Sequence, residues 1–195
     1  MKEVSARERR RIDWILARCR GRVLDLGCGG GAVLRLYGGP GVGIEIDSDL
    51  AQRARDAAPC AEIWTGDAET FSMCCDTLVM AEVLEHQARP IEWMMNAVRR
   101  HAPGRVIVTT PLGYYPHPDH RSIVWPMDLV RALPGATELD CEDGWIRFVW
   151  APETDPAHDQ ALALSATQKG CEWSQRWWEG HCAAQVARAR KEHAK

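Results

Sequence analysis

The segment 23–31 has the sequence VLDLGCGGG, an apolar run with one acid that opens into a glycine-rich turn. Its first four residues are typical of a buried β-strand, and residues 32–37 continue with helical spacing. Glycine has no Cβ, so the turn lets the backbone approach a bound molecule closely. The free N–H groups at the start of the following helix would point to the same place. The segment therefore predicts a strand–turn–helix unit that binds a ligand.

The alternation of strand and helix continues along the rest of the chain. Apolar runs between turn residues predict strands, and apolar residues at helical spacing predict helices. Expected strands are residues 22–26, 42–46, 61–65, 77–81, 105–110, 136–141 and 145–150. Expected helices are residues 3–20, 32–37, 48–57, 90–101, 126–133 and 172–191. A Glu-Asp-Gly turn joins the last two strands, which is typical of a β-hairpin.

Strands that alternate with helices predict an α/β fold with a doubly wound sheet. We expect a mostly parallel seven-stranded sheet with a terminal antiparallel hairpin, and ligands at the carboxyl ends of its strands. We divide the chain into an N-terminal helix packed on the domain (1–22), a cofactor-binding domain (23–150) and a C-terminal extension with a helix (151–195). Three tryptophans of the extension are expected to pack on the core or a second copy, or to cover a bound aromatic ring: Trp173, Trp177 and Trp178.

The composition is that of an ordinary soluble domain. The 195 residues are 46% hydrophobic and 26% charged, with a net charge of −3, which fits one domain with a sizeable core. No apolar run has the length to cross a bilayer, and the charged N-terminus lacks the apolar middle of a secretory signal. We therefore expect a cytoplasmic protein with no membrane partner. Basic residues concentrate in segment 1–22 rather than on a broad face, which disfavours duplex nucleic acid as a partner.

Two cofactors compete for the glycine turn. Gly27, Gly29 and Ala32 satisfy the G-x-G-x-x-G/A pattern of dinucleotide sites. Asp25, however, would repel a pyrophosphate, whereas S-adenosylmethionine (SAM) presents an ammonium and a sulfonium. Glu45, near the end of the next strand, can accept hydrogen bonds from both hydroxyls of a ribose. The charge of Asp25 therefore favours SAM over a dinucleotide.

Four segments resemble class I SAM-dependent methyltransferases in order and spacing. They are DLGCGGG at 25–31, GDAE at 66–69, DTLVMAEVLEH at 76–86, and APGR at 102–105 with the strand that ends in TTP at 109–111. The resemblance implies a Rossmann-like fold, with Asp25 and the glycines facing the methionine part, Glu45 the ribose and Asp67 the adenine amino group. The full set of expected cofactor residues is Asp25, Gly27, Gly29, Gly31, Glu45, Ile46, Asp67, Ala68 and Ala81.

The run Glu82-Val83-Leu84-Glu85-His86 indicates a possible metal site. On a helical turn, Glu82, Glu85 and His86 would share one face, because residues three and four apart are neighbours there. Two carboxylates and an imidazole can hold a divalent cation. A further ligand would come from the loop 114–120. The alternative is that Glu85 and His86 only cap the turn after the strand, or that His86 is a base without a metal.

A narrower resemblance concerns the same run and the later loop. The T-T-P, the tyrosines, the D-H pair at 119–120 and the W-x-x-D-L at 125–129 resemble the small-RNA 3′-terminal 2′-O-methyltransferases. That resemblance implies Mg²⁺ or Mn²⁺ on the two hydroxyls of a terminal ribose, with Glu82, Glu85, His86 and His120 as ligands and His117 as a weaker candidate. The short loop and the acidic surface depart from an RNA enzyme. Ubiquinone-type O-methyltransferases also carry E-x-L-E-H, so the motif extends to small catechol-like acceptors.

The sequence predicts an enzyme that methylates a hydroxyl group of a small molecule. His86 or His120 would accept the hydroxyl proton, because imidazole titrates near neutral pH. A bound metal would instead lower the hydroxyl pKa. Two alternatives remain at this stage: metal-dependent 2′-O-methylation of an RNA 3′ end, and a SAM-binding module without transfer activity. The acceptor and the oligomeric state stay undetermined.

Overall fold

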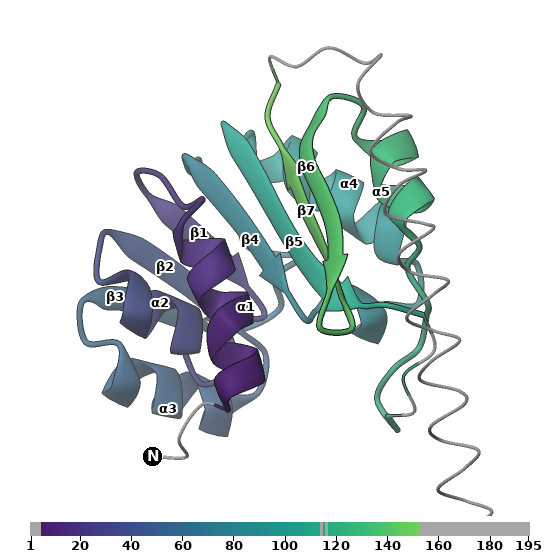
Figure 1. The fold of residues 1–195 in the computed structure, drawn as a ribbon. Coiled ribbons are helices and arrows are strands. Elements are labelled where there is room, and N and C mark those ends of the chain that lie inside the picture. Colours follow the sequence, from purple (N-terminus) through teal and green to yellow (C-terminus); the bar gives the residue numbers. More distant parts are fainter. Residues whose placement is uncertain (1–4, 114, 116, 153–195) are drawn as a thin grey trace, which may run out of the picture.

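Seven strands form one sheet in the order β3-β2-β1-β4-β5-β7-β6 (Figure 1). The computed structural model describes residues 5–113, 115 and 117–152. The strands are β1 (Val23–Leu26), β2 (Gly41–Glu45), β3 (Ala61–Thr65), β4 (Thr77–Ala81), β5 (Arg105–Pro111), β6 (Ala136–Glu142) and β7 (Trp145–Trp150). β1 to β5 pair in parallel, and β7 runs antiparallel to both β5 and β6. The predicted fold class is confirmed, including the terminal hairpin.

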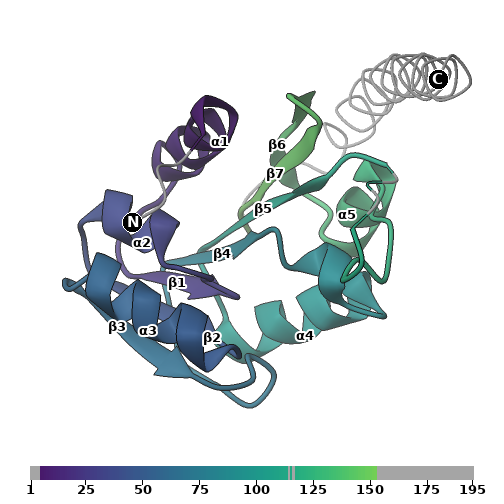
Figure 2. The same cartoon turned by 90° about the horizontal axis from the view of Figure 1, so that it is seen from below.

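Helices cover both faces of the sheet, which explains why β1 and β4 are apolar almost throughout (Figures 1 and 2). The helices of one face are α1 (Ala6–Leu16), α2 (Ala32–Tyr37) and α3 (Ser48–Ala57), and those of the other are α4 (Pro90–His101) and α5 (Pro126–Ala132). Alternate strand residues point to opposite faces. Val79 and Ile107 therefore pack under the first group, while Leu78 and Met80 pack under the second.

The glycine turn after β1 depends on backbone conformations that other residues adopt at a cost. Gly27 and Gly31 have φ values of +70° and +75°. A Cβ on Gly27 would lie 2.8 Å from a Val83 methyl carbon, and one on Gly31 would lie 3.0 Å from Cα of Ala54. Gly31 therefore lets α2 pack closely on α3, whereas Gly27 lets the turn approach the segment after β4.

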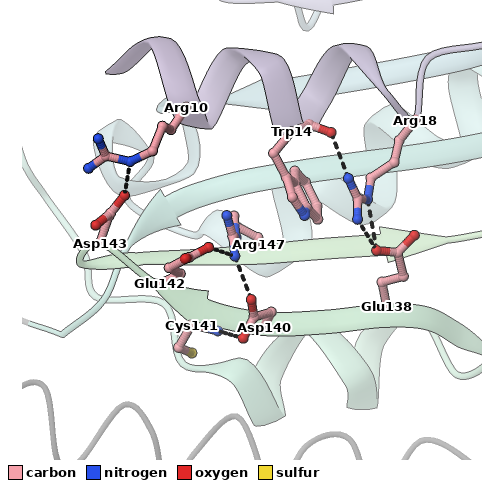
Figure 3. A network of polar contacts seen from close by, with 9 residues as sticks. All are labelled: Arg10, Trp14, Arg18, Glu138, Asp140, Cys141, Glu142, Asp143 and Arg147. Carbon is pink, nitrogen blue, oxygen red and sulfur yellow. Dashed lines mark hydrogen bonds and ion pairs between the residues drawn. The ribbon is translucent and has the colours of Figure 1, made fainter. Parts of the chain in front are cut away.

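The terminal hairpin is the docking site of α1 (Figure 3). Arg10 pairs with Asp143 at the hairpin turn, and Arg18 pairs with Glu138 on β6. The ring of Trp14 stacks against the guanidinium of Arg147, 5.4 Å from its centre. The opposite side of α1 buries Ile12 and Ile15 in the core. The helix is thus fixed across the antiparallel end of the sheet.

Two local predictions are wrong. The expected helix 3–20 is shorter, because α1 ends at Leu16 and the chain turns through Gly21, at φ +57°, into β1. The expected helical turn over residues 82–86 does not form as a whole. The N–H of Glu82 still donates to the Thr109 carbonyl (2.8 Å) as the last bond between β4 and β5, its backbone is left-handed at φ +59°, and only Leu84–His86 form a short 3₁₀ helix.

Two further predictions concern the C-terminal helix and membrane-spanning segments. The C-terminal helix and its three tryptophans, Trp173, Trp177 and Trp178, lie outside them. Within the described ranges, no helix combines the length and the apolar character that a membrane span requires.

Candidate active site

A cavity of about 440 Å³ opens at the carboxyl ends of β1 to β4. This cavity, called the cofactor cleft below, is where a doubly wound sheet binds its ligand. Five segments line it: the glycine turn, the end of β2 with the start of α3, the loop after β3, the segment after β4, and α4. The lining residues are Gly27, Gly29, Ile44, Glu45, Ile46, Leu50, Gly66, Asp67, Ala68, Glu69, Glu82, Val83, His86, Gln87 and Trp93.

Glu45 is held rigidly in the wall of the cofactor cleft. The amide of Gly29 donates to its Oε2 (2.8 Å) and the amide of Asp47 donates to its Oε1 (2.9 Å). A carboxylate oxygen has further lone pairs, so two ribose hydroxyls can still donate to it. Ile46 beside it is 72% exposed and offers an apolar surface to a flat ring.

Asp25 is the buried acid beneath the glycine turn. Its Oδ1 is buried and accepts no hydrogen bond from the part of the chain that the structure describes. Burial raises the pKa of Asp25 to about 7, Arg11 opposes this rise, and Glu45 adds to it. Because an unpartnered buried carboxylate is costly, a cationic hydrogen-bond donor would be strongly bound. The ammonium of SAM fits this requirement.

Six of the nine expected cofactor residues line the cofactor cleft, and three do not. Asp25 lies beneath it, Gly31 caps α2 and packs on α3, and Ala81 ends β4 without contributing to the wall. Sequence analysis missed Leu50 of α3 and the Trp93 side of α4, among others. No local motif marks these residues, because their contribution depends on how the two helices pack on the sheet.

A second cavity, of about 410 Å³, lies beside the first. It is called the acceptor cavity below and is formed by the end of β5 and the loop before α5. Its lining residues are Glu85, Thr110, Pro111, Gly113, Tyr115, His117, His120, Arg121, Ser122, Ile123 and Val124. His86 lines the cofactor cleft whereas its neighbour Glu85 lines the acceptor cavity. The chain at residues 85–86 therefore separates the two cavities.

Glu85, His86 and His120 form a cluster of possible metal ligands at this boundary. One donor atom from each lies within 4.8 Å of the other two. Nδ1 of His86 lies 3.1 Å from the Asp119 carbonyl oxygen, and Nδ1 of His120 lies 3.1 Å from the Tyr115 carbonyl oxygen. A carbonyl only accepts, so each Nδ1 carries the proton. The Nε2 lone pair of a neutral ring is then available, as in metal-binding histidines.

Glu85 completes this donor set. Its Oε2 accepts from the Thr110 hydroxyl (3.1 Å), while its Oε1 is buried without a hydrogen bond among the described residues. Burial raises the pKa of Glu85, and His86 and Thr110 oppose the rise. Burial and the neighbouring imidazoles of His86 and His117 lower the pKa of His120, which favours the neutral ring. One carboxylate and two imidazoles are a donor set of first-row divalent metal sites, and the orphaned oxygen of Glu85 fits a cation.

Neither Glu82, the fourth predicted ligand, nor His117, the weaker candidate, belongs to this cluster, although the ring of His117 lies 5.0 Å from that of His120. Glu82 faces Arg11, with 3.8 Å between its Oε1 and Nη1 of the arginine, and it lines the cofactor cleft. Burial raises its pKa well above the usual value, Glu85 adds to the rise, and Arg11 opposes it. His117 is exposed, and its Nδ1 accepts from the Asp119 amide (3.3 Å). The structure therefore brings together three of the four predicted ligands.

Comparison with known proteins assigns the family. A family model described as a methyltransferase domain matches residues 4–145. Magnesium protoporphyrin IX methyltransferase (ChlM) from Synechocystis PCC 6803, with bound S-adenosylhomocysteine (SAH), has 14% identity and a TM-score of 0.61. The likeness covers 76% of this chain and 87% of ChlM. No curated protein matches the chain.

Two further solved structures are named for RNA or for Hen1. The small RNA methyltransferase HEN1 has 17% identity and a TM-score of 0.62, over 80% of this chain and 27% of HEN1. The methyltransferase domain of bacterial CtHen1-C has 17% identity and a TM-score of 0.57, over 74% of this chain and 98% of that domain. At such identities the likeness concerns the fold, and the family model covers most of the chain. The chain therefore belongs to the methyltransferase domain family and is a class I SAM-dependent methyltransferase.

Proposed function

We propose that this enzyme is a metal-dependent O-methyltransferase whose acceptor hydroxyl is held by Glu85, His86 and His120. The observation that carries the proposal is the position of this cluster on the boundary between the cofactor cleft and the acceptor cavity. A hydroxyl bound there has access to both cavities. Methyl transfer from a sulfonium requires mainly alignment of the nucleophile with the methyl group, and binding supplies this alignment.

The three side chains have separate tasks in this proposal. Glu85 and His120 would hold a divalent ion from the side of the acceptor cavity and His86 from the side of the cofactor cleft, so that the hydroxyl oxygen would bind at the ion. A divalent ion in the cluster would lower the pKa of the hydroxyl. Without an ion, His86 or His120 would accept the hydroxyl proton as a general base. Asp25 would bind the ammonium of SAM, Glu45 its ribose and Asp67 its adenine.

We propose a small molecule with two adjacent hydroxyls, such as a catechol, as the acceptor. A volume of about 410 Å³ lies within the usual range of small-molecule sites. Tyr115 and Ile123 line the cavity and are 42% and 41% exposed, so they offer apolar contact to a ring.

The second candidate is the 3′-terminal ribose of RNA, which also presents two adjacent hydroxyls. The printed names of HEN1 and CtHen1-C favour it, together with the likeness of their folds. Transfer to RNA would require the rest of the strand to leave the acceptor cavity across the surface of the domain. Binding that weakens steeply with added salt would be the signature of its phosphates.

The test of the proposal measures methyl transfer from labelled SAM in the presence of Mn²⁺. Acceptors are catechol, a short RNA with a ribose 3′ end and the same RNA with a 2′-deoxy 3′ end. We expect transfer to catechol that is lost with a chelator. Transfer to the ribose end alone would select the RNA candidate, and full activity with a chelator would overturn metal dependence.

His120→Ala and His117→Ala form a matched pair for this assay. Both histidines belong to the same loop and line the acceptor cavity, but only His120 belongs to the donor cluster. We expect His120→Ala to lower Mn²⁺ affinity and methyl transfer at least tenfold, and His117→Ala to change both less than threefold. Equal losses in the two variants would contradict the assignment of His120.

A further inference from the structure

Arg11 belongs to the N-terminal helix but lies against Glu82 in the wall of the cofactor cleft. Its side chain is only 9% exposed. Nη1 donates to the Thr109 hydroxyl (3.0 Å) and lies 3.8 Å from Oε1 of Glu82. Its guanidinium carbon lies 5.2 Å from the ring centre of Trp145. Arg11 therefore joins the end of β5 to the segment that follows β4.

Docking of α1 alone does not account for this arrangement. Arg10 and Arg18 make the ion pairs that hold α1 on the hairpin, and both of these pairs are at least partly open to solvent (Figure 3). Burial of a guanidinium costs desolvation that an exposed pair avoids. Nε of Arg11 even lacks a hydrogen-bond partner among the residues that the structure describes. Such an interior cation calls for a buried anion as its partner.

Glu82 is the acidic residue that faces Arg11, and its position is unusual. Its Oε1 is buried and accepts no hydrogen bond within the described chain. Nη1 of Arg11 lies 3.8 Å from this oxygen. Its backbone has a φ of +59°, a conformation that non-glycine residues rarely adopt and that surrounding structure must enforce. The same residue lines the cofactor cleft beside Gly27, Gly29 and His86.

We propose that Arg11 is a positioning residue of the active site, which holds the Glu82 carboxylate in the wall of the cofactor cleft. The N-terminal helix is then part of the cofactor site and not only a cover for the hairpin. Glu82 acts here as the partner of Arg11, separate from the donor cluster of Glu85, His86 and His120. The inference rests on the cofactor cleft of a SAM-dependent enzyme and is independent of any metal.

The test is a double-mutant cycle on SAH binding, measured by calorimetry without added metal. We expect Arg11→Met and Glu82→Gln each to weaken SAH binding about tenfold, and the double variant to bind no more weakly than the weaker single one. This non-additivity is the signature of two residues that act as a unit. Arg11→Lys keeps the cation and should recover at least half of the loss on a logarithmic scale.

Arg10→Met is the matched control, because Arg10 is the preceding residue of the same helix and pairs with the hairpin instead. We expect its SAH affinity to stay within twofold of the wild type. A merely structural Arg11 would lower the melting temperature and leave the SAH affinity of the folded protein unchanged. That outcome, or additive losses in the double variant, would overturn the proposal. A wild-type chain that binds no SAH would remove the cofactor site itself, which is a different failure.

Discussion

The two halves of the active site are built in different ways. On the cofactor side, the proposed ligand groups are backbone amides and carboxylates at the ends of β1, β2 and β3. On the acceptor side, the donor cluster joins residues 85–86 to His120, which belongs to a loop of a different strand. Local sequence determines the first half, whereas packing between distant segments assembles the second.

This difference separates what is common to methyltransferases from what selects the reaction. The strand–turn–helix unit is expected to bind the same cofactor whatever the acceptor is, so its residues can form a short, recognisable motif. In the proposed function, the loop residues that line the acceptor cavity would determine which hydroxyl reaches the cluster, and loops of this kind vary without disturbing the sheet. Substitutions should therefore separate cofactor binding from metal binding, and the predictions below test that separation.

The largest expected effect concerns Asp25. Asp25→Asn keeps the shape of the side chain but removes the negative charge that would bind the SAM ammonium. We expect SAH affinity to fall about 100-fold, in line with the loss of a buried charged pair. Calorimetric titration measures it, with Asp47→Asn as a control, because Asp47 is exposed and caps α3. Unchanged affinity in Asp25→Asn would remove the counter-ion role and the separation built on it.

The same residue makes stability depend on pH. Burial raises the pKa of Asp25 from 3.8 to about 7, so the folded chain binds a proton more tightly than the unfolded chain does. The unfolding free energy of the cofactor-free protein should therefore fall as pH rises from about 4 to about 7. We expect Asp25→Asn to be more stable than the wild type at pH 8, by up to about 4 kcal/mol, and to lose this advantage at pH 4. Urea unfolding at both pH values measures the difference, and a variant less stable than the wild type at pH 8 would contradict it.

Six of the nine cofactor residues predicted from the sequence line the cofactor cleft, for a physical reason. The glycine turn, Glu45 and Asp67 follow strands directly, so the position of each strand end also positions the side chain. Glu82 could not be placed in this way, because its backbone is left-handed at φ +59°, a conformation that no turn residue in the sequence marks. The contacts of Arg11 could not be predicted either. A basic helix is typical of a solvated surface, and the partner Glu82 lies far from Arg11 in the sequence.

Gly31 tests which residues of the glycine turn belong to the cofactor half and which serve packing. The methyl of Gly31→Ala would lie 3.0 Å from Cα of Ala54, and the residue would keep a left-handed backbone. We expect a loss of about 2 kcal/mol in unfolding free energy, measured by urea denaturation, with SAH affinity within threefold of the wild type. Gly30→Ala is the control, because a Cβ there meets no atom within 4 Å. If Gly31→Ala were as stable as the wild type but lost its affinity for SAH, Gly31 would belong to the cofactor residues after all.

The smallest expected effect tests the acceptor half by itself. Glu85→Gln keeps an oxygen ligand beside His86 and His120 but removes its charge, so Mn²⁺ affinity should fall about tenfold. SAH affinity measured without metal should stay within twofold, because Glu85 lines the acceptor cavity and not the cofactor cleft. Asp25→Asn should show the reverse pattern, with weak SAH binding and unchanged Mn²⁺ binding. If Glu85→Gln weakened both ligands equally, the two halves would be one coupled site. The Thr110 hydrogen bond to Glu85 would then be the first contact to examine, because it ties the donor cluster to β5.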